Sequence, residues 1–171
     1  FPTRRSSDLL LIGGRIHIPA DGVKITTPSV AKNASTVEVA TTVKNLTRAK
    51  EKITVEVLIT HAGVVYGKDV VGVTMYKEAE ETVRQTICIE KARLWSPDDP
   101  FLYECVVNVY AGKEKLDEVH EPLGIRKLEL DAQHGLRING EQVKLRGTCI
   151  HHDNGIIGAA TLEKAEERRC R

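Results

Sequence analysis

The sequence lacks the features that would point to a membrane or to nucleic acid. No apolar run reaches the roughly 18 residues that a membrane-spanning helix needs. Neither sign of charge dominates, since 25 lysines and arginines stand against 24 aspartates and glutamates among 171 residues. A balanced surface gives no electrostatic reason to expect nucleic acid or an anionic membrane as a partner. We therefore set both partner classes aside.

Paired cysteines are also lacking. The four cysteines, Cys88, Cys105, Cys149 and Cys170, form no Cys-x-x-Cys pair, which argues against a zinc cluster. Cys88 and Cys105 lie too close in the sequence for the inter-sheet bridge of antibody-type domains. We expect four free thiols, and this favours a reducing cytoplasm as the location.

Residues 1–9 are basic and polar and do not match the rest of the chain. The apolar patch behind them is too short for a signal-peptide core of about 7–15 residues. We interpret the segment as a leader that is foreign to the fold, either an artefact or a disordered native extension.

Alternating apolar residues dominate from Val23 to Tyr110 and predict β-strands. Alternation places each set of apolar side chains on one face of a strand, so that two sheets can close over a shared layer. The four clearest sets are Val37-Val39-Thr41-Val43, Ile53-Val55-Val57-Ile59, Val83-Gln85-Ile87-Ile89 and Tyr103-Cys105-Val107-Val109. Frequent turn signals such as Ala62-Gly63 separate them. The pattern predicts an immunoglobulin-like antiparallel β-sandwich of about seven strands.

One short strand is predicted before this stretch, at Arg15–Ile18. It fits two arrangements, the first strand of the sandwich or the last strand of an upstream domain, because a lone strand needs a sheet to join.

The character changes after Tyr110. Residues 136–145 predict a hairpin that turns at Asn139-Gly140. A strand over 146–153, a glycine-rich loop and a helix capped by Thr161 are expected next. Strand, loop and helix are the opening of a βα repeat, and a single βα unit cannot bury its own faces. We expect the chain to stop inside a second domain.

Three segments in this order resemble family 2 glycoside hydrolases of the β-galactosidase type. They are Leu94–Tyr103 (Leu-Trp-Ser-Pro-Asp-Asp-Pro-Phe-Leu-Tyr), Gly124–Arg126 (Gly-Ile-Arg) and Leu136–Asp153, which begins Leu-Arg-Ile-Asn-Gly. The resemblance implies a sugar-binding jelly roll, then this sandwich, then a (β/α)8 barrel that carries the active site. On that plan residues 10–20 end the jelly roll, 21–127 form the sandwich and 128–171 begin the barrel. The expected fold is mainly β, with the first βα unit of an incomplete barrel after the sandwich.

The resemblance also implies a retaining mechanism with two carboxyl groups about 5–5.5 Å apart. In the family both are glutamates on later barrel strands, so no catalytic residue can be named here and the chain alone is expected to be inactive. His151 would come directly after the first barrel strand, at the end where barrel active sites are built. The resemblance gives it a substrate-binding role, with His152 and Asp153 shaping the same pocket. A metal site is the disfavoured alternative, because neighbours in extended backbone point to opposite sides.

Other marked residues have structural interpretations. Trp95 and Tyr103 are expected to pack, with their polar atoms finding partners. Asp98 and Asp99, between two prolines, are expected to form a turn rather than a catalytic pair. Arg126 and Arg146 are expected to hold the junction between sandwich and barrel.

The implied substrate is a β-galactoside, although Cys149 and Ile150 depart from the wider family and leave glucuronides and mannosides open. The implied partners are the missing jelly-roll and barrel parts of the same protein, and homo-oligomers are compatible with the resemblance. No cofactor is expected within these residues, while a longer enzyme could hold a divalent metal. The implied location is the bacterial cytoplasm. The competing hypothesis is a non-catalytic immunoglobulin-like module for carbohydrate binding or adhesion.

Overall fold

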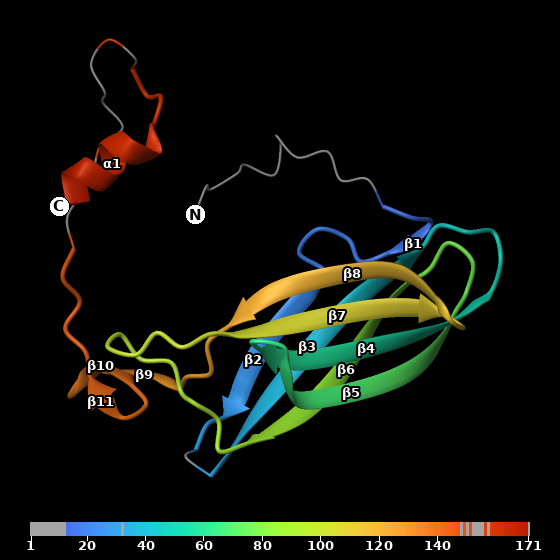
Figure 1. Cartoon of the computed structure of the whole chain (residues 1–171), viewed down its shortest axis with the longest axis horizontal. Helices are drawn as coiled ribbons and strands as arrows, with labels where there is room; N and C mark the ends of the chain where they lie inside the picture. Colours follow the sequence, from blue (N-terminus) through green and yellow to red (C-terminus); the bar gives the residue numbers. More distant parts are fainter. Residues whose placement is uncertain are drawn as a thin grey trace.

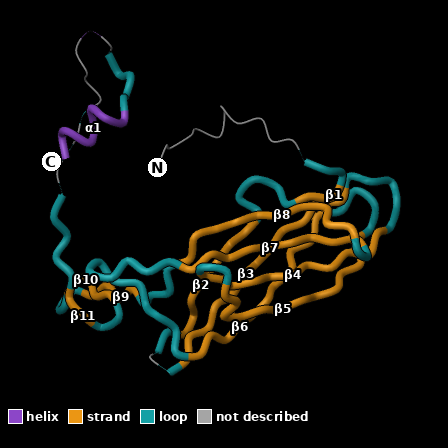
Figure 2. The backbone as a smooth tube through the Cα atoms, viewed as in Figure 1, coloured by secondary structure: helices purple, strands orange, loops and turns teal. Residues whose placement is uncertain are grey.

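The computed structural model describes residues 13–31, 33–147, 149, 151, 156 and 158–170. Most of them lie in antiparallel strands, which stack as two layers (Figures 1 and 2). Within the described part of the chain, no helix is both long and apolar enough to cross a membrane. The prediction of a mainly β fold is confirmed.

Each layer of the sandwich is a four-stranded sheet. In one sheet β3 is central, with β6 along one edge and both β2 and β1 along the other. The second sheet has the order β5-β4-β7-β8. The strands are β1 (Ile16–His17), β2 (Val23–Ser29), β3 (Ala34–Asn45), β4 (Glu51–His61), β5 (Val64–Met75), β6 (Glu80–Glu90), β7 (Tyr103–Ala111) and β8 (Glu114–Leu123). Seven of them, β2 to β8, lie in the range predicted for the sandwich.

The core lies between the two sheets and contains all four alternating sets. None of their sixteen side chains is more than 7% exposed, including the polar Thr41 and Gln85. Tyr103 also finds the expected polar partner, because its hydroxyl accepts a hydrogen bond of 2.8 Å from the backbone N–H of Arg93. The alternation therefore identified the inward face of four strands correctly.

β1 pairs with β3 through Ile16↔Asn45 and so joins the first sheet. The pairing satisfies the need of a short strand for a neighbour. The assignment of residues 10–20 to an upstream jelly roll stays a prediction.

A separate three-stranded sheet lies at the end of the sandwich where β7 begins and β8 ends (Figure 1). It contains β9 (Leu128–Asp131), β10 (Gly135–Ile138) and β11 (Glu141–Gln142). The turn between β10 and β11 has positive φ at both central residues, 54° at Asn139 and 88° at Gly140. Asparagine and glycine tolerate this conformation, which suits a tight hairpin. The predicted turn and hairpin are confirmed, but the returning strand ends at Gln142, so residues 143–145 do not form the rest of it.

The helix α1 (Glu163–Cys170) is also confirmed, and it lies apart from both layers (Figure 1). Its first hydrogen bonds reach the carbonyl of Leu162, so Leu162 caps it rather than the expected Thr161. No residue of α1 is buried. The strand expected over 146–153 is not formed by its described members 146, 147, 149 and 151. A strand needs a neighbour to complete its hydrogen bonds, so the start of a (β/α)8 barrel stays a prediction.

Candidate functional site

The predicted sugar-binding residues come after the small sheet in the chain. His151 is exposed, and its carbonyl accepts a hydrogen bond of 3.4 Å from Arg169 of α1. His152 and Asp153 lie outside the described residues. Of the predicted trio the structure therefore places His151 alone, and the role of all three stays a prediction.

The first motif segment contributes Trp95, which packs against the second. The guanidinium of Arg126 lies over the Trp95 ring, 4.8 Å from its centroid, and the backbone N–H of Trp95 donates to the Ile125 carbonyl over 2.9 Å. Gly124 permits the close approach, since a Cβ there would lie 3.1 Å from the indole ring. Ile125 itself is fully buried in the core. Contacts with the Gly-Ile-Arg segment thus hold the tryptophan at the end of the sandwich.

The third motif segment reaches the same place through Asn139. Its side-chain amide donates a hydrogen bond of 3.0 Å to the Trp95 carbonyl. The three segments are far apart in the sequence, yet together they connect the sandwich to the small sheet. Arg126 stacks on Trp95 and donates a hydrogen bond of 3.4 Å to the Gly124 carbonyl, whereas Arg146 is exposed, and the role of both at a junction with a barrel stays a prediction.

Asp98 and Asp99 belong to the turn that supports Trp95. Asp99 forms a two-point ion pair with Arg93, with N–O distances of 2.9 and 2.7 Å. This pairing lowers the pKa of Asp99, because the guanidinium stabilises its charged form. Ser96 closes the turn by exchanging hydrogen bonds with Asp99. The turn interpretation is confirmed.

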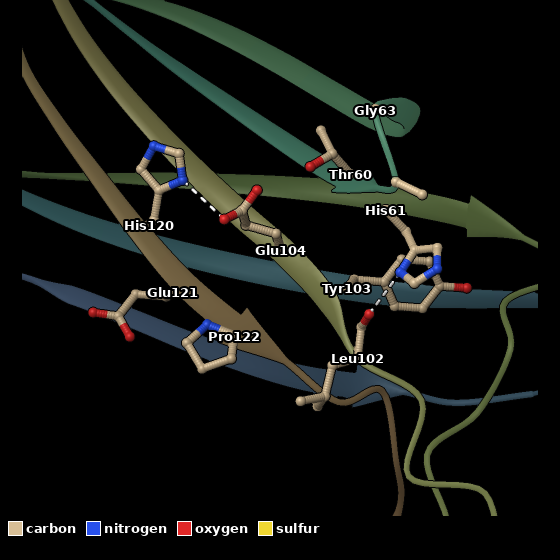
Figure 3. A pocket seen from close by; sticks show the side chains of 10 residues that line it. Thr60, His61, Gly63, Leu102, Tyr103, Glu104, His120, Glu121 and Pro122 are labelled. Carbon is tan, nitrogen blue, oxygen red and sulfur yellow. Dashed lines mark hydrogen bonds and ion pairs between the residues drawn. The ribbon is translucent and has the colours of Figure 1, made fainter. Parts of the chain in front are cut away.

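A hollow of about 330 Å³ opens near the β4–β5 turn and is lined by side chains of β4, β7 and β8 (Figure 3). His120 lies on its rim between two carboxylates, with its Nδ1 2.9 Å from Glu104 and its Nε2 2.9 Å from Glu118. Lys115 pairs with the other oxygen of Glu118. These carboxylates, Glu104 first, raise the pKa of His120 because they stabilise the imidazolium.

This histidine has no ring nitrogen left for catalysis or for a metal, because both are engaged by carboxylates. The sequence did not single out the cluster. Its members meet through the register of β7 and β8, which aligns Glu104 with Pro122 and Val106 with His120. The sequence indicates only that Glu118 and His120, two positions apart in a strand, share a face. Across the described residues, no group of three or more histidines, cysteines or acids could hold a metal ion.

The small sheet has one apolar face that is only partly covered, since Ile138 on this face is buried whereas the two leucines of β9 are exposed. Leu128 and Leu130 of β9 are 57% and 80% exposed, and they pair with Ile138 and Leu136 of β10. Partners across an antiparallel ladder share a face. The opposite face is charged, and there Arg137 of β10 forms an ion pair with Asp131 of β9 at 2.8 Å.

Comparisons with known proteins agree with this architecture. The family model described as Glycosyl hydrolases family 2 matches residues 16–126. The chain is 36% identical over 159 residues to the beta-galactosidase BoGH2A of Bacteroides ovatus, covering 91% of this chain and 18% of that protein. It is 30% identical over 113 residues to a beta-glucuronidase of Bacteroides fragilis, covering 66% of this chain and 16% of that protein.

A solved structure gives the same result. The crystal structure of a glycosyl hydrolase family 2 member from Bacteroides cellulosilyticus matches with a TM-score of 0.84 and 30% identity, over 92% of this chain and 22% of that one. The chain thus spans about a fifth of the length of the relatives it matches. Because the family model covers well over half of the sequence, this chain belongs to family 2 of the glycosyl hydrolases.

Proposed function

We propose that the chain is part of a retaining glycoside hydrolase that cleaves the O-glycosidic bonds of β-galactosides. The sandwich acts as a scaffold, and the residues after it supply one edge of the sugar site. The observation that carries this proposal is the meeting of the three motif segments at one end of the sandwich, through Trp95, Arg126 and Asn139. The chain leaves the sandwich at this end and continues towards His151.

The exposed leucines of the small sheet support a domain boundary near residue 128. An apolar face of this kind is unfavourable in water and is expected where a further part of the protein packs. We assign residues 21–127 to the sandwich and 128–171 to the start of a (β/α)8 barrel. Residues 10–20 would end a jelly roll, with Ile16–His17 at its end pairing with β3 of the sandwich. The remaining parts of such an enzyme would cover Leu128 and Leu130.

The sugar-binding group would be His151, His152 and Asp153. An imidazole and a carboxylate can both bond sugar hydroxyls, since a neutral imidazole donates with one nitrogen and accepts with the other. The two catalytic carboxyl groups would lie in the rest of the barrel. We place the enzyme in the bacterial cytoplasm, in keeping with four cysteines that are all free thiols.

A β-glucuronide is the second candidate substrate. It is favoured by the similarity to the beta-glucuronidase of Bacteroides fragilis. The family alone does not separate the two sugars, so the choice has to be measured.

Two chimeras test the proposal. Residues 13–170 replace the matching segment of the Bacteroides ovatus beta-galactosidase in one and of the Bacteroides fragilis beta-glucuronidase in the other. The first chimera is expected to retain the larger fraction of its parent's kcat/KM, measured with nitrophenyl glycosides. Better retention in the second would transfer the proposal to glucuronides.

The isolated 171-residue chain is the companion sample. It is expected to release no nitrophenol from either glycoside while its circular dichroism shows a folded β-protein. Turnover by the isolated chain would contradict the assignment of the catalytic groups to other parts of the enzyme. Tight glycan binding by the isolated chain, together with two inactive chimeras, would favour the non-catalytic module.

A further inference from the structure

The turn residue Asn139 connects three segments of the chain. Its side-chain amide N–H donates to the Trp95 carbonyl at 3.0 Å, and its Oδ1 accepts from the Lys127 N–H at 2.9 Å. Its own backbone N–H returns a bond of 2.9 Å to the Lys127 carbonyl. One residue therefore links the loop before β7, the segment between β8 and β9, and the β10–β11 hairpin.

The anchor on the sandwich side is fixed. The backbone N–H of Trp95 bonds to the carbonyl of the buried Ile125, and the Thr27 hydroxyl of β2 donates to the Arg126 carbonyl over 2.9 Å. Ile125 and Arg126, which contact Trp95, are thus held by the core and by the first sheet. The hydrogen bond from Asn139 to Trp95 therefore attaches the small sheet to a rigid part of the sandwich.

On the other side, no described strand of the small sheet pairs with a strand of the sandwich. Among the described strands, the extensive contacts of β9, β10 and β11 are with one another rather than with the sandwich. A hollow of about 380 Å³ at this junction is lined by Val30 and Leu94 together with Lys127, Glu129 and Asn139. The hydrogen bonds of Asn139 cross this junction directly and therefore contribute to its rigidity.

We infer that Asn139 is a positioning residue. Its bonds to Trp95 and Lys127, here called the Asn139 latch, fix the small sheet to the sandwich. The latch thereby sets the direction in which the chain continues towards His151. This consequence for the sugar site rests on the proposed function, whereas the latch itself does not.

The test uses the 171-residue chain labelled with ¹⁵N. In the unchanged chain the small sheet and the sandwich share one rotational correlation time. Asn139→Gly removes the side chain and suits the positive φ of this position, because glycine adopts such a conformation without strain. The small sheet then tumbles faster than the sandwich, and the Lys127 amide exchanges about ten-fold faster, the effect expected for loss of one net hydrogen bond.

Asn139→Asp separates the two side-chain bonds. It keeps an oxygen for the Lys127 N–H and places a second oxygen against the Trp95 carbonyl, where a donor is needed. The Lys127 amide stays protected, while acrylamide quenches the fluorescence of Trp95, the only tryptophan, more efficiently. Asn33→Gly at an exposed position is the matched control and changes neither signal.

A shared tumbling time in both Asn139 variants would overturn the inference. Loss of the sandwich signals in Asn139→Gly would also overturn it, because the residue would then support the whole fold. Inactive chimeras with an intact latch would instead count against the proposed function alone.

Discussion

Replacement of Asn45 by alanine tests the packing of the sandwich at its other end. Asn45 is fully buried, and its side chain makes four hydrogen bonds. The amide nitrogen donates to the carbonyls of Ala49 and Tyr76 at 3.1 and 2.9 Å. The amide oxygen accepts from the backbone N–H and the hydroxyl of Thr47 at 2.9 and 2.7 Å. The side chain therefore holds the β3–β4 loop against the segment directly after β5.

Four bonds at a net ~0.5–1.5 kcal/mol each set an upper range of about 2–6 kcal/mol. We expect a loss in the lower part of this range. The Thr47 hydroxyl is already 3.2 Å from the Ala49 carbonyl, so it can replace the bond that the Asn45 amide makes there. Ala49 and Tyr76 are also exposed residues, so that water reaches this loop. We expect Asn45→Ala to lower the free energy of unfolding by about 2–3 kcal/mol.

Urea unfolding monitored by far-ultraviolet circular dichroism measures this change. With a slope of about 1.5 kcal/mol per molar urea, the midpoint falls by about 1.3–2 M. Asn33→Ala, the same substitution at an exposed position, is the control and should stay within about 0.5 kcal/mol of the unchanged chain. A loss below about 0.5 kcal/mol for Asn45→Ala would refute the reasoning, since the four bonds would then contribute no net stability.

Three further predictions concern charge, reactivity and local stability. The pKa of His120 is raised, so its ion pairs stabilise the fold fully below the ordinary histidine pKa of about 6.5. This stabilisation is lost as pH rises through the higher pKa of the folded state. NMR titration should show the pKa of His120 falling in Glu104→Gln, and an unchanged pKa would contradict the pairing. Burial raises the pKa of Cys105 to about 12, so a disulfide reagent at pH 8 should modify the exposed Cys88 and spare Cys105 in the folded chain. Equal rates of modification of the two thiols would contradict the burial of Cys105 in the core. Amide exchange should be fast in α1 and slow in the sandwich, because α1 buries nothing. Equal protection would mean that the helix packs on a core of its own.

The sandwich was predictable because burial between two sheets imposes a period of two. The sets beginning at Val37, Ile53, Val83 and Tyr103 alternate clearly, and each is buried on its inward face. β5 was harder to recognise, because Val64 and Val65 at its start are both exposed. A strand at the edge of a sheet is weakly constrained, and its alternation is correspondingly faint.

The candidate site was predictable only in part. The turn at Asn139-Gly140 could be inferred from its residues, but the bond from Asn139 to Trp95 joins positions 44 residues apart and depends on the tertiary fold. The pairing of His120 with Glu104 depends on the register of two strands, which the sequence does not display. Local pattern fixes turns and faces, whereas contacts across elements require the packed structure.

The most direct test of the central claim is the effect of His151→Ala on the kcat/KM of the chimera with the Bacteroides ovatus beta-galactosidase. The claim is that the residues after the sandwich supply one edge of a sugar site. Loss of a hydrogen bond to the substrate should lower kcat/KM about ten- to hundred-fold, or ~1.4–2.7 kcal/mol. His134→Ala, at an exposed turn of the small sheet, is the control and should leave kcat/KM unchanged. Equal activity of the two variants would contradict the claim.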